Sequence, residues 1–321
     1  MLTKAIGQSH AKAILMGEHS VVYGEPAIAI PLLNINMVVS IIIRHDQQQI
    51  IKSRYYNGSL SDLAGAYEGV RQLIVFLLEK FNAQDLGFEL TFNSQIPQER
   101  GMGSSAATSI AVIRAFYQLF EEPLNQTILL KMANIEESIT HGSPSGIDTA
   151  TSSSEDPIFF IKNKEVTPFK IDVPGYLVIS DTGIMGQTGL AVSAVRRLFD
   201  EEPSKTRRLI SNLGEAATAA KDALQTGDLV GLGQLMTKAH SHLRALGVSH
   251  PHLETLVKTA IDTNALGAKL TGSGIGGSII ALARNLTDAK HIAQALSEVG
   301  AQEYWISPLA NQMNTEQLTN E

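Results

Sequence analysis

The sequence predicts an α+β fold in two domains, from three observations. A chain of 321 residues is long for a single hydrophobic core. Its first part opens with short strand-like segments and then shows helical periodicity. From about residue 169 the pattern changes to a mixture of strands and longer helices. We therefore expect an N-terminal domain over residues 1–168 and a C-terminal domain over residues 169–321.

In the N-terminal domain, strands come first. The patterns predict strands over residues 4–16 (with an interruption at Gly7-Gln8), 27–30, 37–43, 50–53, 88–92 and 158–161. Apolar residues at helical spacing predict a helix over 62–81. A second helix begins at Ser104 and Ser105 and ends near Phe120, and a third covers 126–140 with Asn125 as its cap. Proline and glycine predict a turn over 141–148.

In the C-terminal domain, helices alternate with strands. Strands are expected over residues 176–180, 268–271, 278–283 and 303–306. Helices are expected over 188–199, 207–226, 228–247, 249–264 and 287–299. The tail after Pro308 is polar, so we expect it to be loosely held.

Composition narrows the class of protein. Hydrophobic residues make up 44% and charged residues 18%, as in ordinary soluble proteins, and the net charge of −7 argues against a nucleic-acid binder. The chain has no cysteine, which excludes disulfides and thiolate metal sites. The N-terminus does not resemble a signal peptide, and the most apolar stretch, residues 35–43, is too short to span a bilayer. We expect a cytoplasmic protein that binds no membrane.

Residues 97–109 carry the strongest local signal, a glycine turn that leads from a strand into a helix. The first N–H groups of a helix lack partners and lie at the positive end of its dipole, so they can bind an anion. Gly101 and Gly103 allow the backbone to approach a phosphate closely. Ser104 and Ser105 add hydroxyls for phosphate oxygens or Mg²⁺. The alternative is an ordinary serine-capped helix after a tight turn.

Two common nucleotide-binding motifs do not apply. The chain lacks the Gly-x-x-x-x-Gly-Lys-Ser/Thr pattern of a Walker A loop. Residues 272–277 match Gly-x-Gly-x-x-Gly, but a strand-like run follows at 278–282, whereas a dinucleotide site requires a helix there. This argues against a nicotinamide- or flavin-dependent oxidoreductase.

Several charged residues are candidates for chemistry near a phosphate. Lys12, at the end of the first strand, can neutralise a phosphate, although a surface lysine is the commoner role. Glu136 and Glu137 lie near a helix C-terminus, which disfavours carboxylates, so one of them is a candidate cation ligand; two solvated glutamates are the alternative. Asp148 follows a rigid turn and can orient or deprotonate an alcohol, or merely bond within its own turn.

The histidines do not predict a metal centre. His240, His242, His250 and His252 are close in sequence, but the first two are two residues apart on a predicted helix and face different directions. Zinc sites usually use thiolates or more histidines, so we do not expect zinc.

Three separated segments together resemble the galactokinase–homoserine kinase–mevalonate kinase–phosphomevalonate kinase superfamily. They are residues 12–24, the glycine–serine stretch at 101–107 and the run at 269–277, and their order spans nearly the whole chain. Within the superfamily, residues 17–24, 141–148 and 246–251 are most similar to the mevalonate kinase family. One departure is Ser273, where relatives often carry alanine, and we assign it no role.

The resemblance implies a fold, an activity and a site. The fold would be a ribosomal-protein-S5-like N-terminal domain and a ferredoxin-like C-terminal domain, with the active site in the cleft between them. ATP would bind at Gly101, Met102, Gly103, Ser104, Ser105 and Ala106, and Ser105 and Glu137 would hold Mg²⁺. Asp148 and Lys12 would be catalytic. Glu18, His19, Gly272 and Gly274 would bind the substrate, with the second glycine run closing over the reacting groups.

The expected reaction is phosphorylation of the primary hydroxyl of (R)-mevalonate by ATP, in the mevalonate route to isoprenoids. Two alternatives stay open: another small-molecule kinase of the superfamily (a phosphomevalonate kinase or a sugar-1-kinase), and a non-catalytic relative that binds a nucleotide or metabolite as a sensor. The presence of Lys12, Glu137 and Asp148 argues against the sensor. We expect small-molecule partners only, and a monomer or homodimer.

Overall fold

The computed structural model describes residues 1–141, 146–164 and 166–310. The chain forms two compact units, and each combines separate stretches of sequence. The first unit contains residues 1–12, 33–98 and 103–153, and the second contains residues 13–32, 99–102 and the chain from residue 154 onward. The chain therefore passes between the units several times. The sequence-based prediction places a single domain boundary after residue 168, and this boundary stays a prediction.

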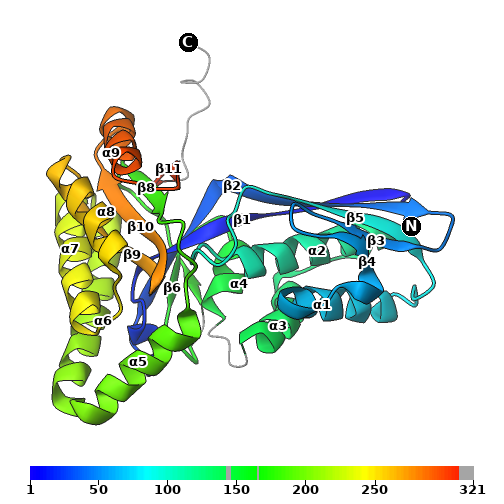
Figure 1. Ribbon diagram of the computed structural model, residues 1–321, viewed down its shortest axis with the longest axis horizontal. Helices are drawn as coiled ribbons and strands as arrows, with labels where there is room; N and C mark the ends of the chain where they lie inside the picture. Colours follow the sequence, from blue (N-terminus) through cyan, green and yellow to red (C-terminus); the bar gives the residue numbers. More distant parts are fainter. Residues whose placement is uncertain (142–145, 165, 311–321) are drawn as a thin grey trace. The chain divides into compact units, whose positions relative to one another are not determined.

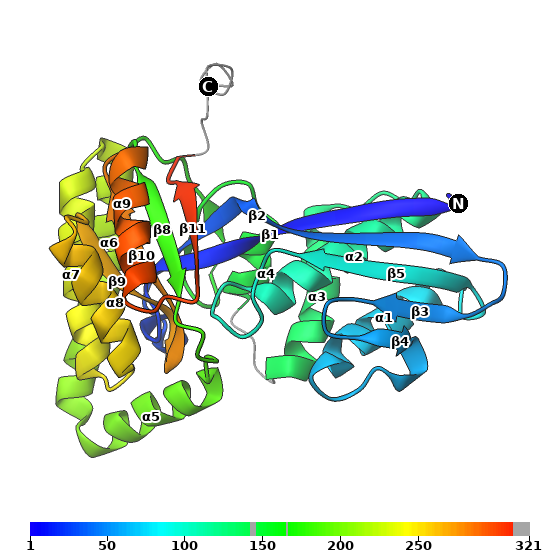
Figure 2. The same ribbon diagram turned by 45° about the horizontal axis from the view of Figure 1, so that its top comes forward.

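The first unit is a sheet with helices. Strands β3 (Gln49–Lys52) and β5 (Gly87–Ser94) are parallel, β4 (Asn57–Ser59) pairs with β3, and β5 runs antiparallel to residues 37–44 of β2 (Ala27–Arg44). Strand β1 (Lys4–Met16) pairs with β2. Figure 2 shows β1, β2 and β5 side by side. The helices are α1 (Glu68–Lys80), α2 (Ser104–Phe120), α3 (Gln126–His141) and α4 (Ile147–Ser152).

The second unit is built on a four-stranded antiparallel sheet with the order β11-β8-β10-β9. These strands are β8 (Tyr176–Asp181), β9 (Gly267–Gly274), β10 (Gly276–Ala283) and β11 (Glu303–Pro308). Helices α7 (Leu229–Ala245) and α8 (Pro251–Asp262) pack on β9, and α9 (Leu286–Glu298) packs on β8 and β11 (Figure 1). Helix α6 (Pro203–Thr226) lies along α7 and contacts α5 (Thr188–Glu201).

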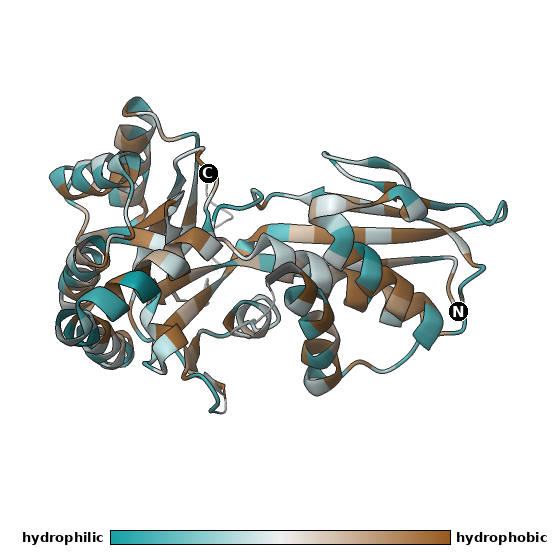
Figure 3. Ribbon diagram, turned by 60° about the horizontal axis from the view of Figure 1, so that its bottom comes forward, coloured by the Kyte–Doolittle hydropathy of each residue, from teal (hydrophilic) through white to brown (hydrophobic). Residues whose placement is uncertain are grey.

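Shorter elements complete this unit. Strand β6 (Ile158–Phe160) pairs with residues 27–29 of β2 and with β7 (Thr167–Pro168). Single 3-10 turns occur in both units: η1 (Ser20–Tyr23), η2 (Leu60–Asp62) and η3 (Gly65–Tyr67). In Figure 3 the hydrophilic colour lies mainly on helices and loops, while the strands are mostly neutral to hydrophobic. Strand β10 is buried along its whole length, so apolar burial holds this sheet in place.

The predicted interruption of the first strand at Gly7-Gln8 is wrong, because β1 is continuous from Lys4 to Met16. Gly7 has a packing role instead. A Cβ atom at this position would lie 1.9 Å from the carbonyl oxygen of Ala111 and 2.5 Å from the backbone nitrogen of Ala115, both on α2. Glycine is thus required because the helix backbone lies directly against the strand. Helix α2 is buried over most of its length, and Phe116 packs edge-to-face on Phe88 of β5.

Two other element predictions also need correction. The strands expected over 27–30 and 37–43 form one long strand, β2, which continues through Pro31. The helix expected from residue 62 begins only at Glu68. Gly65 has a φ of 67°, outside the helical range, so residues 60–67 form two separate 3-10 turns.

The remaining predictions agree with the structure to within a few residues at the ends. Asn125 caps α3 as expected, because its Oδ1 accepts a hydrogen bond of 2.9 Å from the backbone N–H of Ile128. The second glycine run joins β9 to β10 as a hairpin, so a strand and not a helix follows it. The dinucleotide interpretation is thereby excluded. The turn predicted at 141–148 is wrong at its described ends, because His141 is the last residue of α3 and Ile147 and Asp148 open α4. The rest of that turn falls mainly on residues 142–145, and the predicted loose tail partly on 311–321, which lie outside the described residues.

Candidate active site

The end of β1 and the start of α4 bring the two predicted catalytic residues together. The Nζ atom of Lys12 lies 3.0 Å from Oδ1 of Asp148. The Lys12 side chain is 4% exposed, whereas the Asp148 side chain is 37% exposed, so the carboxylate is open to a substrate and the ammonium group is enclosed. Asp148 lies in the first turn of α4, after Gly146 with a φ of 80°. The pair offers a proton acceptor and a fixed positive charge at one point.

The glycine before α2 sets the position of Lys12. Gly103 is the N-cap residue of α2, with a φ of 74°, and no side chain caps this helix start. A Cβ atom on Gly103 would lie 2.7 Å from Cγ of Lys12. The alternative of a serine-capped helix is therefore wrong: Ser104 and Ser105 lie inside the helix. Their N–H groups, with that of Ala106, remain at the positive helix end, where an anion is favoured.

Two glutamates from α3 approach the same helix start. Oγ of Ser105 donates to Oε1 of Glu136 at 2.5 Å, and Oγ of Ser109 donates to Oε2 of Glu136 at 3.2 Å. Glu137 is 4% exposed and accepts a hydrogen bond from the backbone of Thr149. The pKa of Glu137 is raised to about 8, chiefly by burial and also by the carboxylates of Asp148 and Glu136, against the opposing effect of Lys12. Within the described part of the chain, Oε2 of Glu137 is a buried oxygen without a hydrogen-bond partner.

The residues at this position suit Mg²⁺ better than a metal with an all-protein ligand set. In residues 1–141, 146–164 and 166–310, no three His, Asp or Glu side chains converge as metal ligands. Mg²⁺ commonly binds through one or two carboxylates and takes its other ligands from water and substrate phosphates. The unpartnered oxygen of Glu137 and the Ser105 hydroxyl match that pattern. The sequence makes either Glu136 or Glu137 a candidate cation ligand and the resemblance names only Glu137, whereas Glu136 is the glutamate that bonds to Ser105.

The second unit holds the predicted substrate residues. Glu18 follows Gly17 after β1, and its buried carboxylate forms an ion pair with the ammonium group of Lys269 on β9. His19 has a φ of 61° and a ψ of −40°, a conformation with positive φ that is rare for residues with a side chain. Nε2 of His19 lies 3.0 Å from the carbonyl oxygen of Ser273. A carbonyl only accepts hydrogen bonds, so Nε2 carries the proton.

His19 is neutral at working pH. The pKa of His19 is lowered to about 4, chiefly by burial; the hydrogen bond to Ser273 opposes this shift, and the charge on Lys269 adds to it. In a neutral ring with the proton on Nε2, Nδ1 is an acceptor. His19 is thus suited to receive a hydroxyl group.

The two glycine runs meet within the second unit. A Cβ atom on Gly272 would lie 2.9 Å from Cα of Gly101, and one on Gly274 would lie 2.1 Å from the carbonyl oxygen of Val248. Gly101, Gly272 and Gly274 all have positive φ values. Both the close approach and the backbone conformation therefore require glycine. Met102 is fully buried.

Arg100 anchors the segment before Gly101, a role that sequence reasoning missed. Its Nε donates to Asp181 at 3.1 Å, and one terminal nitrogen donates to the carbonyl of Gly183 at 3.0 Å. The carbonyl of Arg100 accepts from Oγ of Ser278 at 3.1 Å. No sequence pattern signals these contacts, because the partners are about 80 and 178 residues away.

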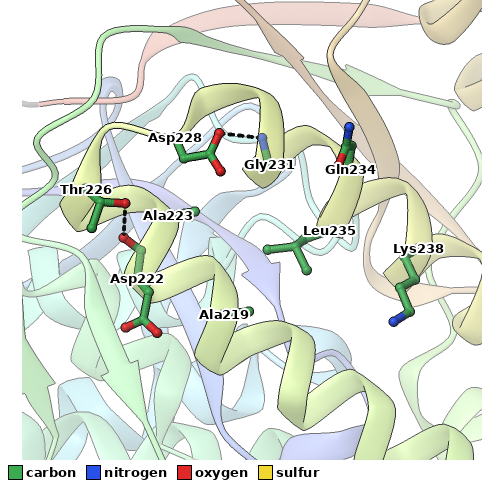
Figure 4. Close-up of a pocket in the computed structure, with 9 residues that line it drawn as sticks. All are labelled: Ala219, Asp222, Ala223, Thr226, Asp228, Gly231, Gln234, Leu235 and Lys238. Carbon is green, nitrogen blue, oxygen red and sulfur yellow. Dashed lines mark hydrogen bonds between the residues drawn. The ribbon is translucent and has the colours of Figure 1, made fainter.

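Among the described residues, the four clustered histidines do not gather into a group of metal ligands. His240 lies 3.2 Å from Glu254, and His250 caps α8. A separate surface groove between α6 and α7 contains none of the predicted site residues (Figure 4). There Asp228 caps α7 by accepting from the N–H of Gly231 at 2.8 Å. Ala219 and Ala223 line part of the groove, and its other polar side chains are those of Asp222, Thr226, Gln234 and Lys238.

Comparison with family models gives the class of protein. The GHMP kinases N terminal domain matches residues 68–155, and the GHMP kinases C terminal model matches residues 220–302. The first match contains the glycine–serine stretch, both glutamates and Asp148; the second contains the run at 272–277. Fold and site together thus define a GHMP kinase, a class that uses ATP.

Relatives narrow the class to one family. The chain is 34% identical to the mevalonate kinase of Pyrococcus furiosus, with 98% of each chain covered, and 33% identical to that of Thermococcus onnurineus, with 87% and 89% covered. It is similar to the crystal structure of L. major mevalonate kinase in complex with R-mevalonate (TM-score 0.82, 27% identity, 96% of both chains). For Staphylococcus aureus mevalonate kinase the TM-score is 0.77 at 32% identity, with 96% and 100% covered. The chain belongs to the mevalonate kinase family.

These findings confirm the predicted family and its two-part α+β fold. Among the described residues, no helix combines the length and the apolar character that a bilayer crossing requires. The cytoplasmic location and the state as monomer or homodimer stay predictions, as does a site in a cleft between the domains.

Proposed function

We propose that this protein transfers the γ-phosphoryl group of ATP to the primary hydroxyl of (R)-mevalonate and forms 5-phosphomevalonate. The observation that carries the proposal is the 3.0 Å contact between Lys12 and Asp148, beside the uncapped start of α2. An alcohol needs both a proton acceptor and a nearby positive charge to become a nucleophile. We infer that the alcohol is mevalonate because the chain belongs to the mevalonate kinase family.

Asp148 and Lys12 have different roles toward the acceptor hydroxyl. The exposed carboxylate of Asp148 orients the hydroxyl and takes its proton as the new O–P bond forms. The enclosed ammonium group of Lys12 stabilises the developing negative charge on the oxygen. Because phosphoryl transfer requires mainly positioning and charge neutralisation, two fixed groups are sufficient on the acceptor side.

The start of α2 holds the nucleotide phosphates. Backbone N–H groups of Ser104, Ser105 and Ala106 donate to phosphate oxygens at the positive helix end, and Gly101 with Gly103 lets the loop approach. Ser105 and Glu137 would hold Mg²⁺, and Glu136 fixes the orientation of the Ser105 hydroxyl. When bound, Mg²⁺ reduces the negative charge on the β- and γ-phosphates.

Glu18, His19, Gly272 and Gly274 form the mevalonate pocket in this proposal. Neutral His19 accepts a substrate hydroxyl at Nδ1, while its Nε2–H stays bound to Ser273. Gly272 and Gly274 have no side chains, so the backbone at these positions is suited to contact the substrate.

Steady-state kinetics with (R)-mevalonate and Mg-ATP test the proposal. A panel of phosphomevalonate, galactose, homoserine and mevalonate, coupled to ADP release, distinguishes the members of the superfamily. We expect kcat/KM for mevalonate to exceed that for the other alcohols by at least about 100-fold, since a site that hydrogen-bonds its substrate rejects poorly matched ones strongly. ADP release with another alcohol of the panel, or with none, would contradict the proposal.

A further inference from the structure

Lys269 is an unusual residue in this molecule because its side chain is completely buried. Lysine is almost never fully buried unless it is paired. The ammonium group bonds to the Glu18 carboxylate, itself 1% exposed, and donates to the carbonyl of Leu270 at 2.7 Å. All of these groups lie in the second unit. A buried ion pair adds little net stability compared with apolar residues of similar size, so the pair calls for a reason other than stability.

The surroundings of Lys269 connect it to the predicted substrate pocket. On β9, Lys269 and Thr271 are two residues apart and therefore lie on the same face. Oγ1 of Thr271 accepts from the N–H of Ile14 at 3.1 Å and donates to the carbonyl of Ile14 at 3.0 Å. This face of β9 thus holds the end of β1, from which the chain turns at Gly17 into Glu18 and His19.

We propose that Lys269 is a positioning residue for mevalonate binding, which fixes the Glu18 carboxylate in its ionised form and in one orientation at the pocket. The inference rests on the proposed function of Glu18 and His19. Lys269 acts through Glu18, and it touches neither substrate. The strained backbone of His19, with its φ of 61°, agrees with a segment held by tertiary contacts against its own conformational preference.

The charged and titratable groups around Lys269 are few. Glu18 is its ion-pair partner, and His19 lies within its electrostatic influence. Burial lowers the pKa of His240 on α7, and the charge of Lys269 lowers it as well. His240 contacts the carboxylate of Glu254 on α8, which also forms an ion pair with Arg244. Burial lowers the pKa of Lys269, and the Glu18 carboxylate opposes this and favours the charged form. Removing Lys269 therefore deprives Glu18 of the cation that keeps it ionised.

The test is the variant Lys269→Met, assayed in the full chain from about pH 6 to about pH 9. Without its cation, the buried Glu18 carboxyl stays protonated to higher pH. We expect kcat/KM for mevalonate to fall at least about 10-fold near neutral pH and to recover as the pH rises. The KM for ATP stays within about 2-fold, because only the pocket of the alcohol is disturbed. Lys258→Met, which breaks an exposed pair with Asp262, is the matched control.

The variant Lys269→Met leaves Glu18 buried without its cation, and this alone can prevent folding. The double variant Glu18→Gln/Lys269→Met removes both charges, so it tests the proposal without this problem. If Lys269 acts through Glu18, the double variant and Glu18→Gln have the same kcat/KM and the same flat pH profile. A further loss on adding Lys269→Met to Glu18→Gln overturns the proposal. So does Lys269→Met with wild-type mevalonate kinetics and pH profile. A wild-type protein that does not phosphorylate mevalonate refutes the proposed function instead.

Discussion

At the scale of single residues, the Lys12–Asp148 contact leads to the most direct prediction. Asp148→Asn removes the proton acceptor but keeps the size of the side chain, so kcat falls by at least about 100-fold while ATP binding is nearly unchanged. Turnover and nucleotide titration measure the two effects separately. Asp156→Asn, at an ion pair with the exposed Lys170, is the control and keeps wild-type turnover. Near wild-type turnover of Asp148→Asn would remove this carboxylate from the mechanism.

The Glu137 carboxyl gives a pH-dependent prediction for stability. In the folded protein its pKa is raised from 4.5 to about 8, so the folded state binds the proton more tightly than the unfolded chain. The contribution of Glu137 to the free energy of unfolding is therefore fully present below about pH 4.5 and is lost as the pH rises to about 8. The loss amounts to about 3–5 kcal/mol.

Denaturant unfolding without Mg²⁺, repeated across this pH range, measures the effect. Glu137→Gln keeps a neutral side chain at every pH, so this variant lacks that part of the pH dependence. The same variant needs more Mg²⁺ for half-maximal activity if Glu137 is a ligand. Identical pH profiles for both proteins would show that burial does not hold the proton on Glu137, and an unchanged metal titration would argue against the ligand role.

At the scale of elements, the start of α2 depends on Gly103. Gly103→Ala forces a side chain into the left-handed region and pushes a Cβ atom against the stem of Lys12, 2.7 Å away. We expect a loss of kcat of at least about 10-fold, because a small displacement of a catalytic group is costly. Gly65→Ala is the matched control: its φ is also positive, but a Cβ atom there meets open space. Equal activity of the two variants would contradict the proposed role of Gly103.

The packing of β1 on α2 gives a second prediction at this scale. Gly7→Ala inserts a methyl group 1.9 Å from the carbonyl oxygen of Ala111, so strand and helix must separate. Overpacking of this kind costs about 1–3 kcal/mol of unfolding free energy, measured by chemical denaturation. Gly189→Ala, in the first turn of α5 with open space around it, is expected to be neutral or slightly stabilising. A neutral Gly7→Ala would mean that α2 moves away from β1 without cost.

At the scale of the whole molecule, ligand binding connects the site to global stability. A protein with a net charge of −7 can bind a nucleotide because Lys12 and the start of α2 provide local positive charge. Mg-ATP at about 100 times its Kd would add about 2.7 kcal/mol to the free energy of unfolding. Thermal unfolding with and without a chelator measures the metal contribution. If ATP raised the Tm by the same amount with and without Mg²⁺, a metal site formed by Ser105 and Glu137 would be contradicted.

Local sequence determined most elements of the fold. Alternating apolar residues identified β5, a continuous apolar run identified β8, helical periodicity identified the long helices, and Asn125 marked the start of α3. These signals act between neighbours in the chain, so they can be read without a structure. The errors at Gly7, Pro31 and Gly65 have a common cause, since a residue that usually interrupts an element is tolerated, or not, according to its tertiary neighbours.

For the site, too, some features could be predicted from the sequence and others only from the tertiary structure. The sequence by itself determined the reactive residue types and the family, because glycine turns, Lys12, Glu137 and Asp148 carry their chemistry in their identity. Only the tertiary structure decided that Glu136 bonds to Ser105, that Arg100 anchors its loop and that Lys269 is buried against Glu18. Those pairings join residues 31 to 251 positions apart, and burial gives them their strength by excluding water.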